Sequence, residues 1–155
     1  MSDCDQRPPR GAGEGESGWK GIRVVLESYS ASFRVPSLAG YQLTLPVPPL
    51  STVYGLLSAA GGRWIDPQEV PWLAFSFTYE GRAVDLESIV TFERPKSTSV
   101  AAPTGRNVVR REFLTFTRLA LFLPQEWAEV FHRPRFPLVL GRSQDVAALG
   151  GITEE

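Results

Sequence analysis

Basic side chains gather in one stretch of this sequence, and their chemistry suits an anionic partner. Residues 94–118 contain six basic residues against one acidic residue, Glu112, whereas the whole chain has a formal net charge of −1. A locally basic segment on a nearly neutral protein predicts one surface that binds an anion, in place of general affinity for polyanions. The basic residues of this stretch are Arg94, Lys96, Arg106, Arg110, Arg111 and Arg118.

Residue types that carry catalysis are sparse. His132 is the only histidine, and a single histidine at the end of a helix more often stabilises the helix dipole than it catalyses. Cys4 is the only cysteine and lies in a polar segment, which predicts an inert thiol. The sequence shows no nucleophile–base pair, no paired carboxylates and no phosphate-binding glycine loop. We therefore expect a binding protein without a cofactor or a metal ion.

The basic stretch must be presented by a strand pair. Residues 95–107 are mostly small, polar or proline, and strand-forming runs flank them at 89–93 and 108–123. A long polar tip between two strands predicts a protruding arm, 94–111, that binds something. The alternative is a mobile solvated loop.

A proline corner followed by a helix comes before the arm. Pro46, Pro48 and Pro49 force the chain to leave a strand, and Ser51 or Thr52 is a suitable N-cap for the helix. Apolar residues recur at helical spacing over 52–60, and Gly61-Gly62 supplies the C-terminal stop. The apolar positions are Val53, Leu56, Leu57 and Ala60.

The remaining elements are short. We expect a strand at 22–26, an antiparallel hairpin formed by 73–79 and 84–92, a single helical turn at 66–70, a helix at 124–131 and a strand that breaks at Gly141. The aromatic residues of the first hairpin strand face the core or, alternatively, stack on bases; they are Phe75, Phe77 and Tyr79. Arg34 is either a solvated loop charge or a phosphate contact.

Length and element order set the fold class. A chain of 155 residues with 43% hydrophobic residues supports one domain with a real core. We expect a disordered polar tail at 1–20, one domain at 21–150 and a short tail at 151–155. The pattern predicts an α+β fold in the ferredoxin manner. The sequence has no run of membrane-spanning length and no apolar signal-peptide core, so we expect a soluble cytoplasmic protein.

Three strings resemble the CRISPR-associated Cas-five family of the RAMP superfamily. They are Ser-Phe-Arg-Val-Pro at 32–36, the proline corner and helix at 45–61, and Leu-Val-Leu-Gly-Arg-Ser-Gln-Asp at 138–145. The middle string is the specific one, and the order and spacing of the three extend the resemblance over about 21–146.

The resemblance implies an RRM-like antiparallel sheet with short helices and a thumb hairpin. It implies a subunit of a type I interference complex (Cascade) that caps the 5′ handle of the guide RNA (crRNA). The implied partners are a Cas-seven backbone subunit, the large subunit and, indirectly, target DNA. The residues expected at the RNA are Arg34, Pro48, Ser51, Tyr54, Lys96, Arg106, Arg110 and Arg111. Arg142 and Asp145 are expected to be structural or at a protein interface.

Two other functions remain open. One branch of the family cleaves precursor RNA with a Tyr, Lys and His group, but this chain offers only His132 beside Lys20 and Lys96. We therefore expect no enzymatic activity, and the alternative is a metal-independent endoribonuclease that uses His132. The other alternative is a protein-interaction adaptor that makes no contact with RNA.

Overall fold

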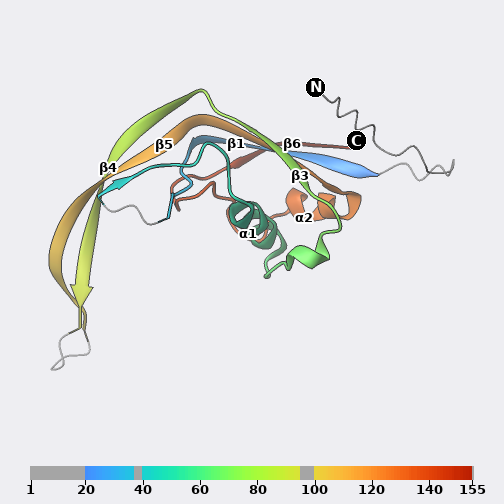
Figure 1. The fold of residues 1–155 in the computed structure, drawn as a ribbon. Coiled ribbons are helices and arrows are strands. Elements are labelled where there is room, and N and C mark those ends of the chain that lie inside the picture. The colour runs from blue at the N-terminus through green and yellow to red at the C-terminus, as the bar shows by residue number, and fades with distance from the viewer. Residues whose placement is uncertain (1–19, 37–39, 95–99, 155) are drawn as a thin grey trace, which may run out of the picture.

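A six-stranded sheet with helices on one face forms the body of the protein in a computed structural model (Figure 1). The structure describes residues 20–36, 40–94 and 100–154. The expected tail at 1–20, apart from Lys20, and the expected RNA contact Lys96 lie outside these residues. The α+β class is confirmed, while the ferredoxin-like form stays a prediction.

One long strand organises the sheet. The strands are β1 (Gly21–Ala31), β2 (Tyr41–Gln42), β3 (Ala74–Thr78), β4 (Gly81–Glu93), β5 (Ala102–Pro124) and β6 (Ala148–Glu154). The order is β2-β5-β1-β6, and β3 and β4 also pair with β5. Among the strands described, β2 alone pairs in parallel with β5. β5 runs antiparallel to β1, β3 and β4, and β6 runs antiparallel to β1. Four strands, β1, β2, β3 and β4, therefore form backbone hydrogen bonds with β5.

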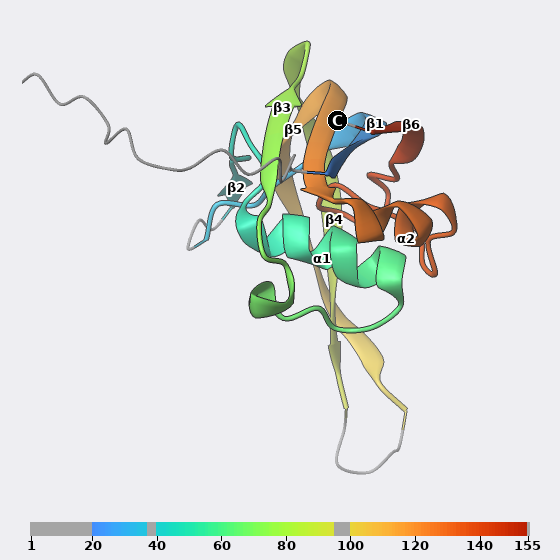
Figure 2. The same ribbon diagram turned by 90° about the vertical axis from the view of Figure 1, so that its right-hand side faces the viewer.

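The helices cover one face of the sheet (Figures 1 and 2). They are α1 (Leu50–Gly61) and α2 (Ala128–His132), with 3-10 turns η1 (Pro67–Glu69) and η2 (Gln125–Trp127). Strand residues of alternating position bury their side chains against these helices, as the period of two in a strand requires. Fully buried members include Ile22, Val24, Leu26, Leu119, Leu121 and Leu123.

Helix α1 confirms the predicted helix but begins differently. Its buried residues are the four predicted from the apolar spacing, and the C-cap Gly62 has φ 71°, in the left-handed region. The N-cap is Pro49, and no side chain caps the helix. The prediction of Ser51 or Thr52 as the N-cap was wrong, because the backbone carbonyl of Pro49 accepts from the N–H groups of Thr52 and Val53 and both residues already lie inside the helix.

The expected hairpin between 73–79 and 84–92 does not form. Strands β3 and β4 pair one after the other with β5, at 118–122 and 102–115 respectively. The two intervening residues do not reverse the chain, since the N–H of Glu80 donates to the carbonyl of Thr115 and keeps the segment on β5. The aromatic residues Phe75, Phe77 and Tyr79 pack against the core, as the core interpretation predicted.

The C-terminal part differs from the expected boundary at residue 150. Residues 148–154 form β6, which pairs with β1, so 151–154 belong to the sheet and not to a tail. The predicted strand near Gly141 is reduced to one bridge, between Val139 and Val146. Within the described ranges, no helix has the length and apolar character needed to cross a membrane.

Candidate nucleic-acid interface

The outer parts of β4 and β5 form an arm that projects from the body (Figures 1 and 2). Cα partners run from Leu86 and Arg110 outward to Glu93 and Ala102. The side chains of the arm are exposed at residues 88–93 of β4 and at residues 102–108 of β5. The ribbon therefore depends on its ladder hydrogen bonds and leaves its side chains available to a partner. The described residues thus form a projecting strand pair where an arm was predicted, but 102–107 belong to β5 and not to the polar tip expected at 95–107, of which 95–99 lie outside the described residues.

Register divides the arm into two faces of different chemistry. Directly opposite residues share a face, and residues two apart along a strand share it as well. Leu86 opposes Arg110, Ser88 opposes Val108, and Val90 opposes Arg106. We call this side the cationic face: Leu86, Ser88, Val90, Arg106, Val108 and Arg110, together with Phe92, which lies two residues beyond Val90 on β4 although the register with β5 shifts between Thr91 and Phe92.

The cationic face combines charge with exposed apolar groups. Leu86 is 66% exposed and Phe92 is 60% exposed. Arg106 and Arg110 are exposed as well, and neither makes an ion pair with another described residue. Guanidinium groups bind phosphates, while apolar and aromatic side chains contact bases. This face is therefore suited to single-stranded nucleic acid.

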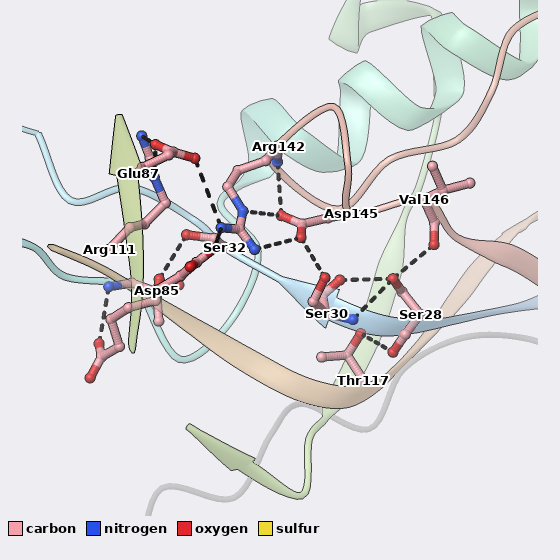
Figure 3. A network of polar contacts seen from close by, with 12 residues as sticks. Ser28, Ser30, Ser32, Asp85, Glu87, Arg111, Thr117, Arg142, Asp145 and Val146 are labelled. Carbon is pink, nitrogen blue, oxygen red and sulfur yellow. Dashed lines mark hydrogen bonds and ion pairs between the residues drawn. The ribbon is translucent and has the colours of Figure 1, made fainter. Parts of the chain in front are cut away.

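The opposite face uses its charges within the protein. Asp85 opposes Arg111, and Glu87 opposes Val109, which is buried. Nε of Arg111 donates to Oε2 of Glu87 at 2.6 Å, and the Arg111 side chain is only 15% exposed (Figure 3). Arg111 thus has a structural role, because its charge is already paired with an acidic neighbour, and its expected contact with RNA stays a prediction.

A charged network fastens the root of the arm to the loop before β6 (Figure 3). The guanidinium of Arg142 donates to both carboxylate oxygens of Asp145, at 3.0 and 2.9 Å. Its Nη1 lies 3.8 Å from Asp85 and 3.9 Å from Glu87, and the group stacks over the Phe113 ring at 5.2 Å. Burial lowers the pKa of Arg142, but hydrogen bonding and the nearby carboxylates outweigh this effect and raise it, so the cation is retained.

Asp145 belongs to the interior. Its side chain is 0% exposed and also accepts from Oγ of Ser30 at 2.6 Å. The backbone N–H of Arg142 donates to the same carboxylate at 3.0 Å. Of the two roles expected for Asp145, the structure therefore supports the structural one and excludes a direct interface contact, because a fully buried carboxylate cannot reach a partner protein.

Arg34 lies beside the root of the arm. It forms a bridge with Thr44, whose backbone N–H donates to Oε2 of Glu112 at 3.1 Å. Strand β2 lies between Arg34 and Thr44 in the sequence, and it pairs with β5 so that Tyr41 is opposite Arg110. The Arg34 side chain is exposed and has no ion pair among the described residues, so it remains available to an anion near the cationic face.

The residues of the proline corner are not gathered with the arginines of the arm. Pro48 is buried, so its ring is not accessible to RNA, which corrects that expectation. Tyr54 is partly buried and packs against the core. Ser51 is exposed in the first turn of α1, which lies under the sheet (Figure 1). Of these three residues, Ser51 is exposed and Tyr54 is partly exposed, so their expected contacts with RNA stay predictions.

Sequence reasoning missed the apolar half of the interface. Leu86, Val90 and Phe92 were included in a predicted strand but not in the site, since an exposed apolar residue becomes a candidate only when its cross-strand neighbour is known. The sequence signal that could have found them was the alternation of residues along 84–92, which places Leu86, Val90 and Phe92 on one side of a strand. Its meaning depended on the pairing with Arg106 and Arg110.

The described residues offer no metal centre. No group of three or more histidine, cysteine, aspartate or glutamate side chains in the described part of the chain is arranged to hold a metal ion. His132 ends α2 and is exposed to solvent.

Comparisons with known proteins give a structural similarity. No protein-family model matches the chain, and no curated protein matches it. A solved structure described as "Crystal structure of Cas protein" has 26% identity over 81% of this chain and 58% of that chain, with a TM-score of 0.44. A chain of a "CRISPR RNA-guided surveillance complex" has 25% identity and a TM-score of 0.62 over 83% of this chain. The fold of this chain thus resembles that of one protein of an RNA-guided CRISPR complex. The matched region covers 60% of the length of that protein.

Proposed function

We propose that this protein is an RNA-binding subunit of a type I CRISPR interference complex, and that it caps the 5′ handle of the guide RNA. The observation that carries the proposal is the cationic face of the arm, where Arg106 and Arg110 alternate with exposed apolar side chains. The similarity to a chain of an RNA-guided surveillance complex supports it. In this function, a Cas-seven backbone subunit and the large subunit are the protein partners, and target DNA is met only through the guide.

The arm binds RNA through two kinds of contact. Arg106 and Arg110 neutralise phosphates, which releases counterions and makes affinity depend on salt. Phe92 and Leu86 supply apolar surface to bases that leave the stack, as in other single-strand binding sites. Arg34 extends the positive surface toward the body. Sequence specificity for DNA then comes from base pairing between the guide and the DNA, whereas this chain holds the 5′ end of the guide in place.

The test measures RNA affinity at several salt concentrations. Arg106→Gln combined with Arg110→Gln removes two charges from the cationic face without changing a buried residue. We expect affinity for a labelled single-stranded repeat RNA to fall at least about tenfold, and the slope of log affinity against log salt to fall by about 1.4, since each single-strand phosphate contact contributes about 0.7. Fluorescence anisotropy measures both.

The matched control makes the same charge change elsewhere. Arg133→Gln combined with Arg135→Gln alters two exposed arginines that follow α2. Its affinity and salt slope should stay close to those of the parent. If the parent and both double variants have no measurable affinity for RNA while the complex still assembles, the adaptor function replaces the one proposed. Equal and measurable RNA binding by all three proteins would instead mean that RNA contacts this chain outside the cationic face.

The position on the guide is tested by crosslinking. A guide RNA with a photoreactive base in its 5′ handle should crosslink to the arm within the assembled complex. A crosslink confined to the 3′ end would contradict capping of the handle while leaving RNA binding itself intact.

We propose further that the subunit is not catalytic and acts in the cytoplasm. A single exposed histidine without a positioned base or acid partner among the described residues supports binding over cleavage. Incubation with a repeat-containing transcript in the presence of a chelator should leave the RNA intact. Cleavage by the parent that disappears in His132→Ala would establish the endoribonuclease instead.

A further inference from the structure

A second surface, separate from the arm, lies where the sheet bends. On one side of β5, the pairing with β3 ends at Arg118 and the pairing with β4 begins at Thr115. On the other side, β1 pairs with Thr115 and Thr117 but not with Phe116. A cavity of about 650 Å³ opens there, lined by residues of β1, the β3–β4 junction, β5 and the segment that enters β6. The proposed RNA contacts Arg34, Arg106 and Arg110 do not line it.

Two exposed aromatic side chains mark this cavity. Tyr29 is 84% exposed and Phe116 is 57% exposed. Their ring centroids lie 5.9 Å apart at an interplanar angle of 75°, so the two rings form an edge-to-face pair on the surface. Val146, 56% exposed, adds apolar surface at the rim. Large apolar groups at this exposure indicate a binding surface.

The backbone at Phe116 supports a functional purpose. Its φ is 48°, and it is the only described residue other than glycine with a positive φ. An aromatic residue is unfavourable in this conformation, whereas glycine adopts it freely. The conformation coincides with the break in the pairing of β5 and with an exposed ring. Strain of this kind is concentrated at binding and catalytic sites.

The charges of the cavity identify the kind of partner. Glu27 and Glu80 contribute two carboxylates to the lining, against one guanidinium, that of Arg118. Arg118 lies 3.7 Å from Glu27, while the carboxylate of Glu80 has no ion pair among the described residues. This balance repels phosphates and attracts a cation, and aromatic faces bind guanidinium and ammonium groups.

We propose that the cavity is a docking site for a partner protein that inserts an arginine or lysine side chain, flanked by apolar residues, against Tyr29 and Phe116 and toward Glu80. The aromatic pair holds the cation and its aliphatic stem, and the carboxylate neutralises the charge. This interaction does not involve RNA, so it goes beyond the proposed function and does not depend on the arm.

The experiment uses the full chain labelled with ¹⁵N and two peptide probes. N-acetyl-Gly-Leu-Arg-Leu-Gly-amide carries the cation, and the same peptide with glutamine in place of arginine is its neutral match. We expect the arginine peptide to shift the amide resonances of 27–29, 79–80 and 116–118, and the glutamine peptide to bind at least about fivefold more weakly. Tyr29→Ala and Glu80→Gln should each weaken the arginine peptide at least about threefold.

Two control variants distinguish the cavity from the arm and from an exposed tyrosine elsewhere. Tyr41→Ala removes a tyrosine that is 40% exposed on β2, outside the cavity, and should leave peptide binding unchanged. The Arg106→Gln and Arg110→Gln double variant should also bind the peptide normally, so loss of RNA binding and loss of docking are distinguishable.

Three outcomes would overturn the proposal. In the first, the arginine and glutamine peptides shift the cavity resonances equally. In the second, hexauridine shifts these resonances at a lower concentration than the arginine peptide does. In the third, the resonances move with protein concentration when no ligand is added. The second result would identify a nucleic-acid site and the third an interface between copies of this chain.

Discussion

Arg110 and Arg111 are adjacent in the sequence but lie on opposite faces of the arm. Arg110 is exposed beside Leu86, whereas Arg111 is held by Glu87 at 2.6 Å. Composition and local charge treat the two residues alike, and both were expected at the RNA. What separates them is the two-residue period of a strand, combined with a register that brings an acid to one of them and an apolar residue to the other.

This contrast predicts different effects of two neighbouring substitutions. Arg111→Gln leaves the carboxylate of Glu87 without the closer of its two ion-pair partners, since only Arg142 at 3.9 Å remains, and we expect the free energy of unfolding to fall by about 2 kcal/mol. Arg110→Gln should leave stability within about 0.5 kcal/mol of the parent and weaken RNA binding. Urea denaturation measures the free energy of unfolding of both variants, and fluorescence anisotropy measures their affinity for RNA. Equal losses of stability would contradict the assignment of the two faces.

A second prediction at this scale concerns the exposed pair Arg63–Glu69. A side-chain hydrogen bond from Arg63 and a backbone hydrogen bond from Asp66 lower the pKa of Glu69 to about 2. Because this pKa lies below the value of about 4.3 for an unfolded chain, the pair stabilises the fold above pH 4.3 and loses this effect as the pH falls toward 2. The difference in unfolding midpoint between the parent and Glu69→Gln should therefore narrow between pH 5 and pH 2. A difference that is independent of pH would show that the carboxylate charge is not involved.

At the scale of elements, the loop that holds Arg142 is shaped by one glycine. Gly141 has φ 113°, and a Cβ placed there would lie 2.0 Å from the carbonyl oxygen of Ser32. The N–H of Ser32 in turn donates to the carbonyl of Leu140 at 3.1 Å. The close approach of these two backbones brings Arg142 and Asp145 to the root of the arm, so the ion pairs made there depend on a position that has no room for a side chain.

Two glycine substitutions test this dependence. Gly141→Ala should lower the free energy of unfolding by at least about 2 kcal/mol, because both the φ value and the contact with Ser32 oppose it. Gly55→Ala is the matched control in α1, where a Cβ meets nothing within 4 Å, and it should raise stability by about 0.5–1 kcal/mol. Thermal and urea unfolding measure both. A stable Gly141→Ala variant would mean that the loop can move away from β1 without loss.

At the scale of the whole molecule, the core and the arm are energetically separate although they share β5. The buried cluster is built from β1, β5, α1 and their neighbours, and it does not reach the arm beyond Val109. The arm therefore makes little contribution to burial and is free to serve recognition. The protein divides its longest strand between stability at one end and binding at the other.

Removal of the arm tests this division. Glu87 and Val109 are Cα partners, so an Asn-Gly turn that joins them in place of 88–108 closes a hairpin at a natural position. We expect the unfolding midpoint to stay within a few degrees of the parent, since the described residues removed are exposed. RNA affinity should fall at least about tenfold, because the deletion removes Arg106 together with the apolar side chains of Val90 and Phe92. An unfolded product would show that the arm is part of the cooperative unit.

The sequence predicted features that depend on local pattern. The α1 stripe, the glycine C-cap, the Asp66–Glu69 turn and the existence of the arm all follow from spacing and from residues with special backbone preferences. Features that depend on distant pairing were not predictable. The pairing of β3 and β4 in succession with β5, the burial of Asp145 and the exposure of Phe116 each require knowledge of which strand lies next to which.

The two-faced arm also constrains how its length can change. Because a strand alternates sides at every residue, removal or insertion of an even number of residues in each strand moves the tip and leaves Arg106 on the same side as Arg110. A single-residue insertion between them, unless a bulge absorbs it, would turn every side chain beyond it to the other side. Variants of this protein should therefore tolerate arms that differ by two cross-strand pairs at a time, and the reach of the arm along RNA should change in steps of about 7 Å.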